Sequence, residues 1–290
     1  MAWAGKIDSG GKGITRIEDG FIRSRGLGPA LTPPLSLVTD DLGIYYDPSR
    51  LEKLIEQRAT PRLDQEFRAA RLIRSLIDTG LSKYNTGQPP EALPEGHRIL
   101  VCGQVADDAS IRLGTSDITT NQALLDAVRE AHPDAIILYK PHPDVEAGLR
   151  DGALTDPSKA TRIITNTDPA ALLAQVNEVH TMTSLMGFEA LIRGIPVTTY
   201  GAPFYAGWGL TTDKSYVPPR RRATPTIEAL AHATLIDYPR YYDPKTDQPC
   251  PAEVAVLRLS ENDVPAPSRT NRITSKLQRV FARYAHIWRK

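Results

Sequence analysis

Paired acids follow two of the predicted strands. Glu18 and Asp19 come after "GITRI", and Asp107 and Asp108 come after "RILVCGQVA". A carboxylate at the end of a strand can act as a general base or as a nucleophile toward an electrophilic sugar carbon. Each pair also has an ordinary interpretation: a solvated turn for "EDG", and a helix cap for the second pair. Metal binding by Asp107 and Asp108 is a third option, although no histidine or further acid stands near them in sequence.

A second kind of candidate is the stretch "YKPHP" after the apolar run "AIIL". Two prolines cannot continue a strand or lie inside a helix, so this loop is stiff. It presents Lys140 and His142, and both side chains can donate to a phosphate. The alternative is a histidine with a purely structural role.

A Ser/Thr pair opens the helical pattern "LMGFEALIRG". The hydroxyls of Thr183 and Ser184, together with the free N–H groups of the helix start, can bind a phosphate. Glu189 lies within the first two turns of the same helix. Ordinary capping by Ser184, with Glu189 as a solvated helix residue, is the alternative.

Two later stretches also suit a ligand. Residues 200–213 place four aromatics among glycines and a proline, which suits a flat or sugar-like ligand or else a packed turn. Residues 218–222 read "PPRRR", and such an arginine cluster binds carboxylate or phosphate, or else forms a solvated charged run.

The segments that must position these residues alternate between strand and helix patterns. From residue 98 to 201 the alternation predicts βαβ units and a parallel sheet covered by helices. Ligands bind such sheets at the carboxyl ends of the strands, where the polar loops at 103–110, 140–143 and 181–184 would meet. Before residue 90 we expect one helix with Asp47 as its N-cap and Pro48 in its first turn, and a second helix ended by Gly80.

Composition narrows the class of protein. The 290 residues are 41% hydrophobic and 24% charged, which is typical of a globular chain. The net charge of +1 argues against a nucleic-acid partner. Cys102 and Cys250 lack metal-site spacing and indicate a reducing compartment without disulfides. No apolar run approaches the ~18 residues of a membrane span, and the start does not resemble a signal peptide, so we expect a cytoplasmic protein.

The C-terminal segment is strongly basic. After Asp263 there are seven Lys or Arg residues and no acid, and apolar residues recur at helical spacing from Ile273 to Trp288. This pattern predicts a basic amphipathic helix. It would lie on an anionic membrane surface or pack across the protein's own surface.

Several long strings carry a resemblance to a known family. They include "RIEDGFIRSRGLG", "GQVADDASIRLG", "YKPHPDV", "TSLMGFEALIRGIPVTTYGAPFYAGWGLTTD" and "RYYDPKT". Together they resemble the capsule polysaccharide KpsC/LipA family of β-Kdo glycosyltransferases, from about Arg16 to about Thr246. The order of the acidic, "HP" and Ser/Thr motifs is also similar to that of bacterial sialyltransferase-like enzymes, which use CMP-activated sugars.

The resemblance implies an α/β fold of the GT-B-like kind, with two Rossmann-like domains facing a cleft. We expect an N-terminal acceptor-side domain over 1–95, a CMP-sugar-binding domain over 96–245 and an extension with the basic helix over 246–290. Family modules usually carry more chain before the "EDG" strand, so the N-terminal domain is expected to be incomplete.

The resemblance also implies a retaining transfer from CMP-β-Kdo, with no metal and no cofactor. Asp108 would be the nucleophile, with Asp107 as the alternative, and Glu18 the general acid/base. The donor-binding residues would be Gln104, Lys140, His142, Thr183, Ser184 and Glu189, with Arg23 and Arg220 as candidates for the Kdo carboxylate.

The implied partners are a Kdo-bearing lysophosphatidylglycerol-type glycolipid, the anionic inner-membrane surface, and capsule biosynthesis or export proteins. The protein would be peripheral to the inner membrane. The string "FYAGWGLT" is more similar to the second module of two-module members, which would give a 2→7 rather than a 2→4 linkage. Two alternatives stay open: transfer of another CMP-activated nonulosonate, and a non-catalytic capsule-assembly module.

Overall fold

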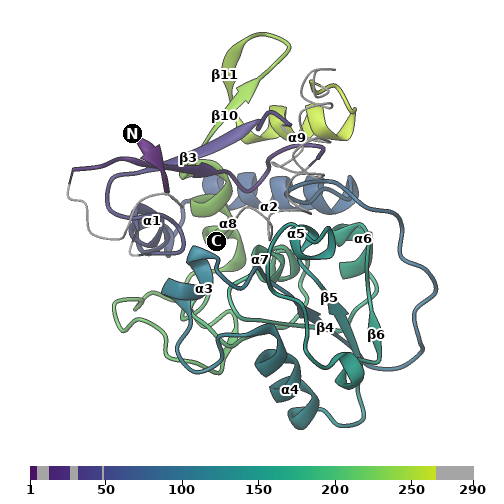
Figure 1. Cartoon of the computed structure of the whole chain (residues 1–290). Helices are drawn as coiled ribbons and strands as arrows, with labels where there is room; N and C mark the ends of the chain where they lie inside the picture. Colours follow the sequence, from purple (N-terminus) through teal and green to yellow (C-terminus); the bar gives the residue numbers. More distant parts are fainter. Residues whose placement is uncertain (5–12, 27–31, 48, 266–290) are drawn as a thin grey trace, which may run out of the picture.

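The computed structural model describes residues 1–4, 13–26, 32–47 and 49–265. They form an α/β molecule with two separate sheets (Figure 1). Within this described part, no helix is long and apolar enough to cross a membrane. The basic helix predicted from Ile273 to Trp288 falls within residues 266–290, which lie outside the described part of the chain.

The larger sheet has six parallel strands in the order β6-β5-β4-β7-β8-β9. Their bounds are Arg162–Ile163 (β6), Ile136–Lys140 (β5), Arg98–Cys102 (β4), Glu178–Thr181 (β7), Val197–Thr199 (β8) and Thr212–Asp213 (β9). The predicted parallel sheet is therefore confirmed. After β4 the chain first adds β5 and β6 on one side of β4, and then adds β7, β8 and β9 on the other side. The strand order therefore reverses between β4 and β7. Open α/β sheets bind ligands beside such a switch point.

Five helices connect these strands, and a side chain caps the N-terminus of each. The helices are α3 (Ala109–Gly114), α4 (Asn121–Ala131), α5 (Pro143–Glu146), α6 (Pro169–Leu173) and α7 (Leu185–Leu191). Thr120 caps α4, and Asp168 caps α6 with a proline in the first turn. These caps satisfy N–H groups that have no partner inside the helix.

The smaller sheet is mixed and combines both ends of the described chain. Its order is β1 (Ala2–Trp3), β2 (Arg16–Asp19), β3 (Ser36–Asp40), β10 (Pro239–Asp243) and β11 (Gln248–Cys250). Strand β10 pairs antiparallel with β3, so residues near 240 return to the sheet that carries "EDG". The expected boundary at 245/246 falls between β10 and β11. The three-part domain division stays a prediction.

The π-helical turn His232–Asp237 packs with helices α1 (Arg50–Arg58), α2 (Leu63–Asp78) and α8 (Ile227–Ala231). Helix α9 (Ala252–Ser260) packs against α2 and β10. Both predicted early helices are present, and Gly80 follows α2 with a φ of +62°. The predicted cap of the first one is wrong. Ser49 accepts the Glu52 N–H, whereas the N–H of Asp47 closes a turn onto the carbonyl of Ile44.

A cluster of aromatic rings joins the two sheets. Phe21, which directly follows "EDG", packs at 5.0 Å from Tyr45 and 5.2 Å from Phe204, measured between ring centroids. Phe204 in turn lies 5.3 Å from Phe188 of α7. Because buried aromatic side chains remove large apolar areas from water, this cluster holds the acidic motif against the parallel sheet.

Candidate active site

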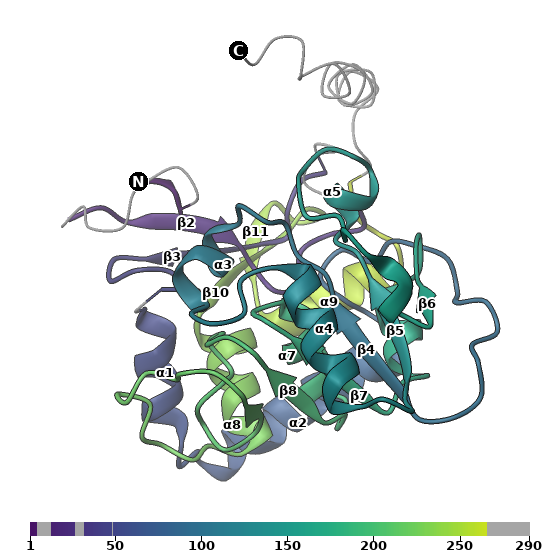
Figure 2. The same cartoon turned by 60° about the horizontal axis from the view of Figure 1, so that its bottom comes forward.

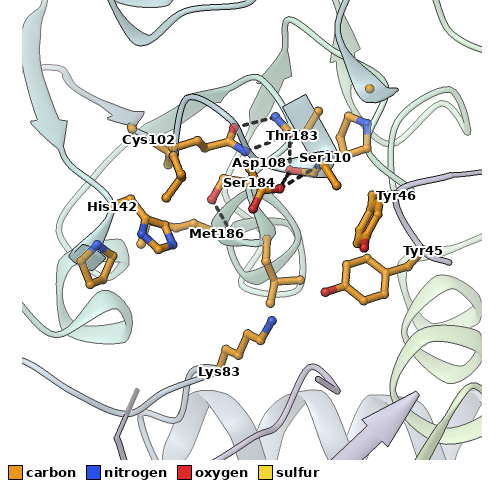
Figure 3. A pocket seen from close by; sticks show the side chains of 18 of the residues that line it. Tyr45, Tyr46, Lys83, Cys102, Asp108, Ser110, His142, Thr183, Ser184 and Met186 are labelled. Carbon is orange, nitrogen blue, oxygen red and sulfur yellow. Dashed lines mark hydrogen bonds between the residues drawn. The ribbon is translucent and has the colours of Figure 1, made fainter. Parts of the chain in front are cut away.

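A cavity of about 390 Å³ opens beside the switch point of the parallel sheet. Figure 3 shows Asp108 and His142 from the loops of the parallel sheet, Tyr45 from the segment after β3, and Lys83 from the segment after α2, all around this cavity. The sequence-predicted residues that line it are Glu18, Gln104, Asp107, Asp108, Lys140, His142, Thr183, Ser184 and Glu189. The three strand-end loops and the "EDG" motif therefore meet at one place.

Gln104 ties the two loops across the switch point. Its side-chain amide donates to Thr183 Oγ1 at 2.8 Å and accepts the Thr183 N–H at 2.9 Å. On its other side, Asn121 Oδ1 accepts the Gln104 N–H at 2.9 Å, and the Asn121 amide donates to the Gln104 carbonyl at 2.7 Å. Buried amides cost free energy unless every hydrogen bond is made, so these bonds fix the loop in one geometry.

Asp108 both caps a helix and lines the cavity. Its Oδ1 accepts the N–H of Ser110 at 2.8 Å and the Ser110 hydroxyl at 2.6 Å. These bonds orient the half-buried carboxylate, and its second oxygen has no hydrogen bond to the described residues. The two interpretations of this residue are compatible, because one oxygen caps α3 and the other is free to act.

Asp107 has very different surroundings. Its side chain is 70% exposed, and its Oδ1 lies 2.5 Å from a guanidinium nitrogen of Arg150. That hydrogen bond holds the pKa of Asp107 below its ordinary value. A solvated, paired carboxylate is a poorer nucleophile than one held with an oxygen free, so the geometry favours Asp108 over Asp107.

Glu18 lies at the cavity edge on strand β2. Its Oε1 accepts the Asp19 N–H at 3.0 Å. Burial raises the pKa of Glu18 above its ordinary value, the nearby charge of Asp108 raises it further, and Lys83 opposes both. Gly20 completes the motif because a Cβ there would lie 2.2 Å from Ser36 Oγ on the adjacent strand. The glycine is therefore required for close strand packing.

His142 is held as a hydrogen-bond donor. Its Nδ1 accepts the Asp144 N–H at 3.1 Å as the N-cap of α5. In the neutral ring the proton is therefore assigned to Nε2. Burial lowers the pKa of His142, although the carboxylate of Asp144 opposes this, so the neutral form is favoured. Lys140 is buried nearby, and burial lowers its pKa too, against the attraction of Glu146.

The start of α7 brings Ser184 and Glu189 to the cavity. Ser184 Oγ accepts the Met186 N–H at 3.3 Å and so caps the helix. Glu189 Oε1 accepts the backbone N–H of Lys83 at 2.8 Å. Burial raises the pKa of Glu189, while Arg193 acts in the opposite direction. Glu189 thus connects the parallel sheet to the segment that follows α2.

Sequence reasoning missed three cations that line this cavity: Lys83, Arg112 and Arg150. Lys83 follows a helix end, not a strand end, so the strand-end rule could not find it. Its ammonium points into the cavity opposite Asp108 (Figure 3). Burial lowers the pKa of Lys83, and attraction to the carboxylates of Asp19 and Glu18 opposes this. Arg150 lies a few residues after His142, in the connection that follows β5. Its nearness to this strand-end loop is a sequence signal that could have identified it.

Two predicted arginines do not line the cavity. Arg23 is buried, and its Nε lies 2.6 Å from the carboxylate of Asp19. Arg220 Nε donates to Glu52 at 2.7 Å. Both guanidinium groups are already paired with carboxylates of the fold, which corrects the expectation that they are placed for a sugar carboxylate.

The aromatic segment divides between packing and the cavity. Ala202, Pro203 and Phe204 line the cavity. Trp208 is buried instead, and its Nε1–H donates to the Phe204 carbonyl at 2.7 Å. The packed-turn interpretation is therefore right for Trp208, while the beginning of the segment borders the site.

Comparison with known proteins identifies relatives across most of the chain. Residues 11–241 match the family described as "Capsule polysaccharide biosynthesis protein". The chain is 49% identical over 256 residues to the capsule polysaccharide modification protein LipA of Neisseria meningitidis serogroup A. That alignment covers 85% of this chain and 36% of LipA, so the chain spans about a third of the length of that relative.

Two solved structures share the fold, and both come from KpsC of Thermosulfurimonas dismutans. The one titled beta Kdo 2,4 transferase has a TM-score of 0.79 and 36% identity, over 85% of this chain and 79% of that one. The one titled beta Kdo 2,7 transferase has a TM-score of 0.71 and 41% identity, over 86% and 78%. These likenesses confirm the expected GT-B-like α/β architecture.

Proposed function

The chain belongs to the capsule polysaccharide biosynthesis protein family, with LipA and KpsC among its relatives, and from this we propose that it transfers Kdo from CMP-β-Kdo to a glycolipid acceptor. One observation carries the proposal: Glu18, Asp108 and His142, from three separate motifs, line a single cavity. We propose a retaining reaction in two displacements, without a metal or cofactor.

In the first displacement, a carboxylate oxygen of Asp108 attacks the anomeric carbon of Kdo. The bond from that carbon to the phosphate oxygen breaks, and CMP leaves with the electron pair. Phosphate is a good leaving group, so the main requirement is stabilisation of its charge. His142 Nε2–H, Lys140 and the hydroxyl of Ser184 are the donors that line this part of the cavity.

In the second displacement, an acceptor hydroxyl attacks the same carbon and releases Asp108. Glu18 takes the hydroxyl proton. Two inversions restore the starting configuration, which is the logic of retaining glycosyl transfer. The raised pKa of Glu18 suits a base that must accept a proton during this step.

We assign Lys83, in place of Arg23 and Arg220, as the group that binds the Kdo carboxylate. It lines the cavity together with Glu18, and the carboxylates of Glu18 and Asp19 favour its charged form. Glu189 is our candidate for the group that binds the ribose hydroxyls of CMP.

The acceptor we propose is a Kdo-bearing lysophosphatidylglycerol at the anionic inner-membrane surface, where the enzyme would be peripheral. The structural likeness to both Kdo transferases leaves the 2→4 and 2→7 linkages as equal candidates.

The test is CMP release by the full chain with CMP-Kdo and the glycolipid acceptor. We expect turnover by the wild type, a loss of at least about 10³-fold in Asp108→Ala, and retained turnover in the matched Asp107→Ala. Equal turnover by wild type and Asp108→Ala would contradict the mechanism. No turnover by any of them would favour a non-catalytic assembly module. Preference for another CMP-nonulosonate in the same assay would replace Kdo as the substrate.

A further inference from the structure

Three of the chain's six histidines gather around one glutamate, away from the cavity. Glu178 and His180 lie on β7, two residues apart, and therefore project from the same face of the strand. His132 ends α4 as its C-cap, and His97 immediately precedes β4. The helix and the two strands lie side by side in Figure 2. The cluster sits at the amino ends of the parallel strands, opposite the strand-end loops.

The side-chain atoms of this cluster converge on one point. One ring nitrogen of His132, one of His180 and one carboxylate oxygen of Glu178 all lie within 4.8 Å of each other. His180 Nε2 is 2.8 Å from Glu178 Oε1, and the His132 and His180 ring centroids are 5.1 Å apart. Ligands of a tetrahedral zinc ion, with bonds of 2.0–2.1 Å, lie about 3.3 Å apart, so small side-chain rotations suffice.

Neighbouring groups orient these side chains as outer partners of metal ligands do. The hydroxyl of Tyr200 lies 3.4 Å from His180 Nδ1, the nitrogen away from Glu178. The hydroxyl of Thr198 donates to Glu178 Oε1 at 3.3 Å. His97 Nε2 is 3.6 Å from Glu178 Oε2, so a further imidazole stands beside the carboxylate. A simple histidine–glutamate hydrogen bond would explain His180 but neither of the other two histidines.

We propose that His132, Glu178 and His180 bind one divalent transition-metal ion of the zinc type. Two imidazoles and a carboxylate are a ligand set that zinc accepts, with a fourth position for His97 or water. None of these residues lines the transferase cavity, so the ion would have a structural role. It would join the end of α4 to the start of β7, which are far apart in sequence.

The test is a titration of the metal-stripped full chain with Zn²⁺ by calorimetry, repeated with Co²⁺ to record its visible absorption. We expect one saturable site. His132→Ala and Glu178→Gln are expected to weaken it by at least about 10-fold, because loss of even an outer partner of a metal ligand has that effect. His142→Ala, which removes a histidine from the cavity instead, is the matched control and should bind as the wild type does.

Thermal unfolding provides a second reading that does not depend on the affinity measurement. Zn²⁺ should raise the Tm of the wild type and of His142→Ala, because it binds the folded state, and should leave that of His132→Ala unchanged. His132 is only half-buried, so its removal should not prevent folding. Unchanged affinity in His132→Ala, equal losses in His142→Ala, or no saturable Zn²⁺ binding by the wild type would overturn the proposal.

Discussion

Adjacent residues in the cavity have different surroundings, and their chemistry follows from this. Asp108 keeps one oxygen free while the other caps α3, whereas Asp107 is paired with Arg150 in solvent. The sequence shows two neighbouring acids and cannot separate them. The separation comes from Arg150, whose position depends on the path of the loop after His142. At this scale the motifs identify candidates, and the contacts assign roles.

Glu18→Gln should lower turnover by about 10²–10⁴-fold, the usual contribution of a general base. It should also stabilise the fold at pH 7. Burial raises the folded-state pKa of Glu18 above 4.5, so the protonated form is favoured in the folded protein and stability is lost as pH rises through that pKa. Glutamine imitates the protonated form and keeps that stability.

Thermal unfolding of wild type and Glu18→Gln from pH 7 toward pH 4.5 measures the effect. The variant should have the higher Tm at pH 7, and the difference should shrink as the pH falls. Wild-type turnover should rise with pH through the raised pKa of Glu18, because the base must be ionised. A variant that is less stable at every pH would show that burial does not disfavour this carboxylate.

His142→Asn should separate the two roles of this histidine. Asparagine is a good N-cap and can still accept the Asp144 N–H, but it lacks the Nε2–H donor. We expect near-wild-type stability with strongly reduced turnover in His142→Asn. His142→Ala should lose turnover and about 0.5–2 kcal/mol of stability as well. Chemical denaturation and CMP release measure both quantities, and full activity of the asparagine variant would exclude a role for the ring.

At the scale of elements, the parallel sheet depends on the contact between the loops after β4 and β7. Gln104 and Thr183 exchange two buried hydrogen bonds there. Gln104→Ala leaves the Thr183 N–H without its partner, which should cost about 1–3 kcal/mol in urea unfolding. A double-mutant cycle with Thr183→Val should give a coupling energy of about 0.5–3 kcal/mol. Strict additivity would mean that the two loops are held by other contacts.

The elements of the parallel sheet could be predicted because their signals are local. The run "ILVC" in β4 is continuous and apolar, as a strand buried on both faces requires, and Asp168-Pro169 is a typical helix start. The pairing of β10 with β3 could not be predicted, since it joins segments about 200 residues apart. The cap of α1 was misplaced by two residues, because Asp47 and Ser49 are equally good caps by type.

The candidate site could be predicted where residues follow strand ends. Asp108, His142 and Thr183 were found in this way, since carboxyl ends of parallel strands meet at one edge. Lys83 follows a helix, and no local pattern places it there. The prediction that Arg23 and Arg220 line the site is wrong because each forms an ion pair, Arg23 with Asp19 and Arg220 with Glu52. These pairs depend on tertiary packing, which the sequence does not show.

At the scale of the whole molecule, one buried carboxylate links α1 to the segment that borders the cavity. Glu52 accepts from Arg220 at 2.7 Å and from Arg221 at 2.9 Å. Arg221 is almost fully buried and also donates to the Pro203 carbonyl at 2.6 Å. The ion pair therefore supports the backbone of a residue that lines the cavity.

Glu52→Gln should destabilise the protein by about 3–5 kcal/mol, because it leaves the guanidinium of Arg221 buried without its counter-charge. Arg220→Ala is the matched comparison. Its side chain is 49% exposed, so its loss should cost no more than about 1 kcal/mol. Urea unfolding of the two variants measures both values. Similar small losses would show that Arg221 has enough support from its carbonyl partners alone.

The central claim is that Asp108 forms a covalent bond to the sugar, and mass spectrometry of the protein tests it most directly. Glu18→Gln is incubated with CMP-Kdo and no acceptor, so that the first displacement proceeds and the second is blocked. We predict a mass increase of one Kdo residue on the peptide spanning 104–110, located at Asp108 and missing from the Asp108→Asn variant. No adduct from an enzyme whose wild type releases CMP, or an adduct on a different residue, would contradict the mechanism.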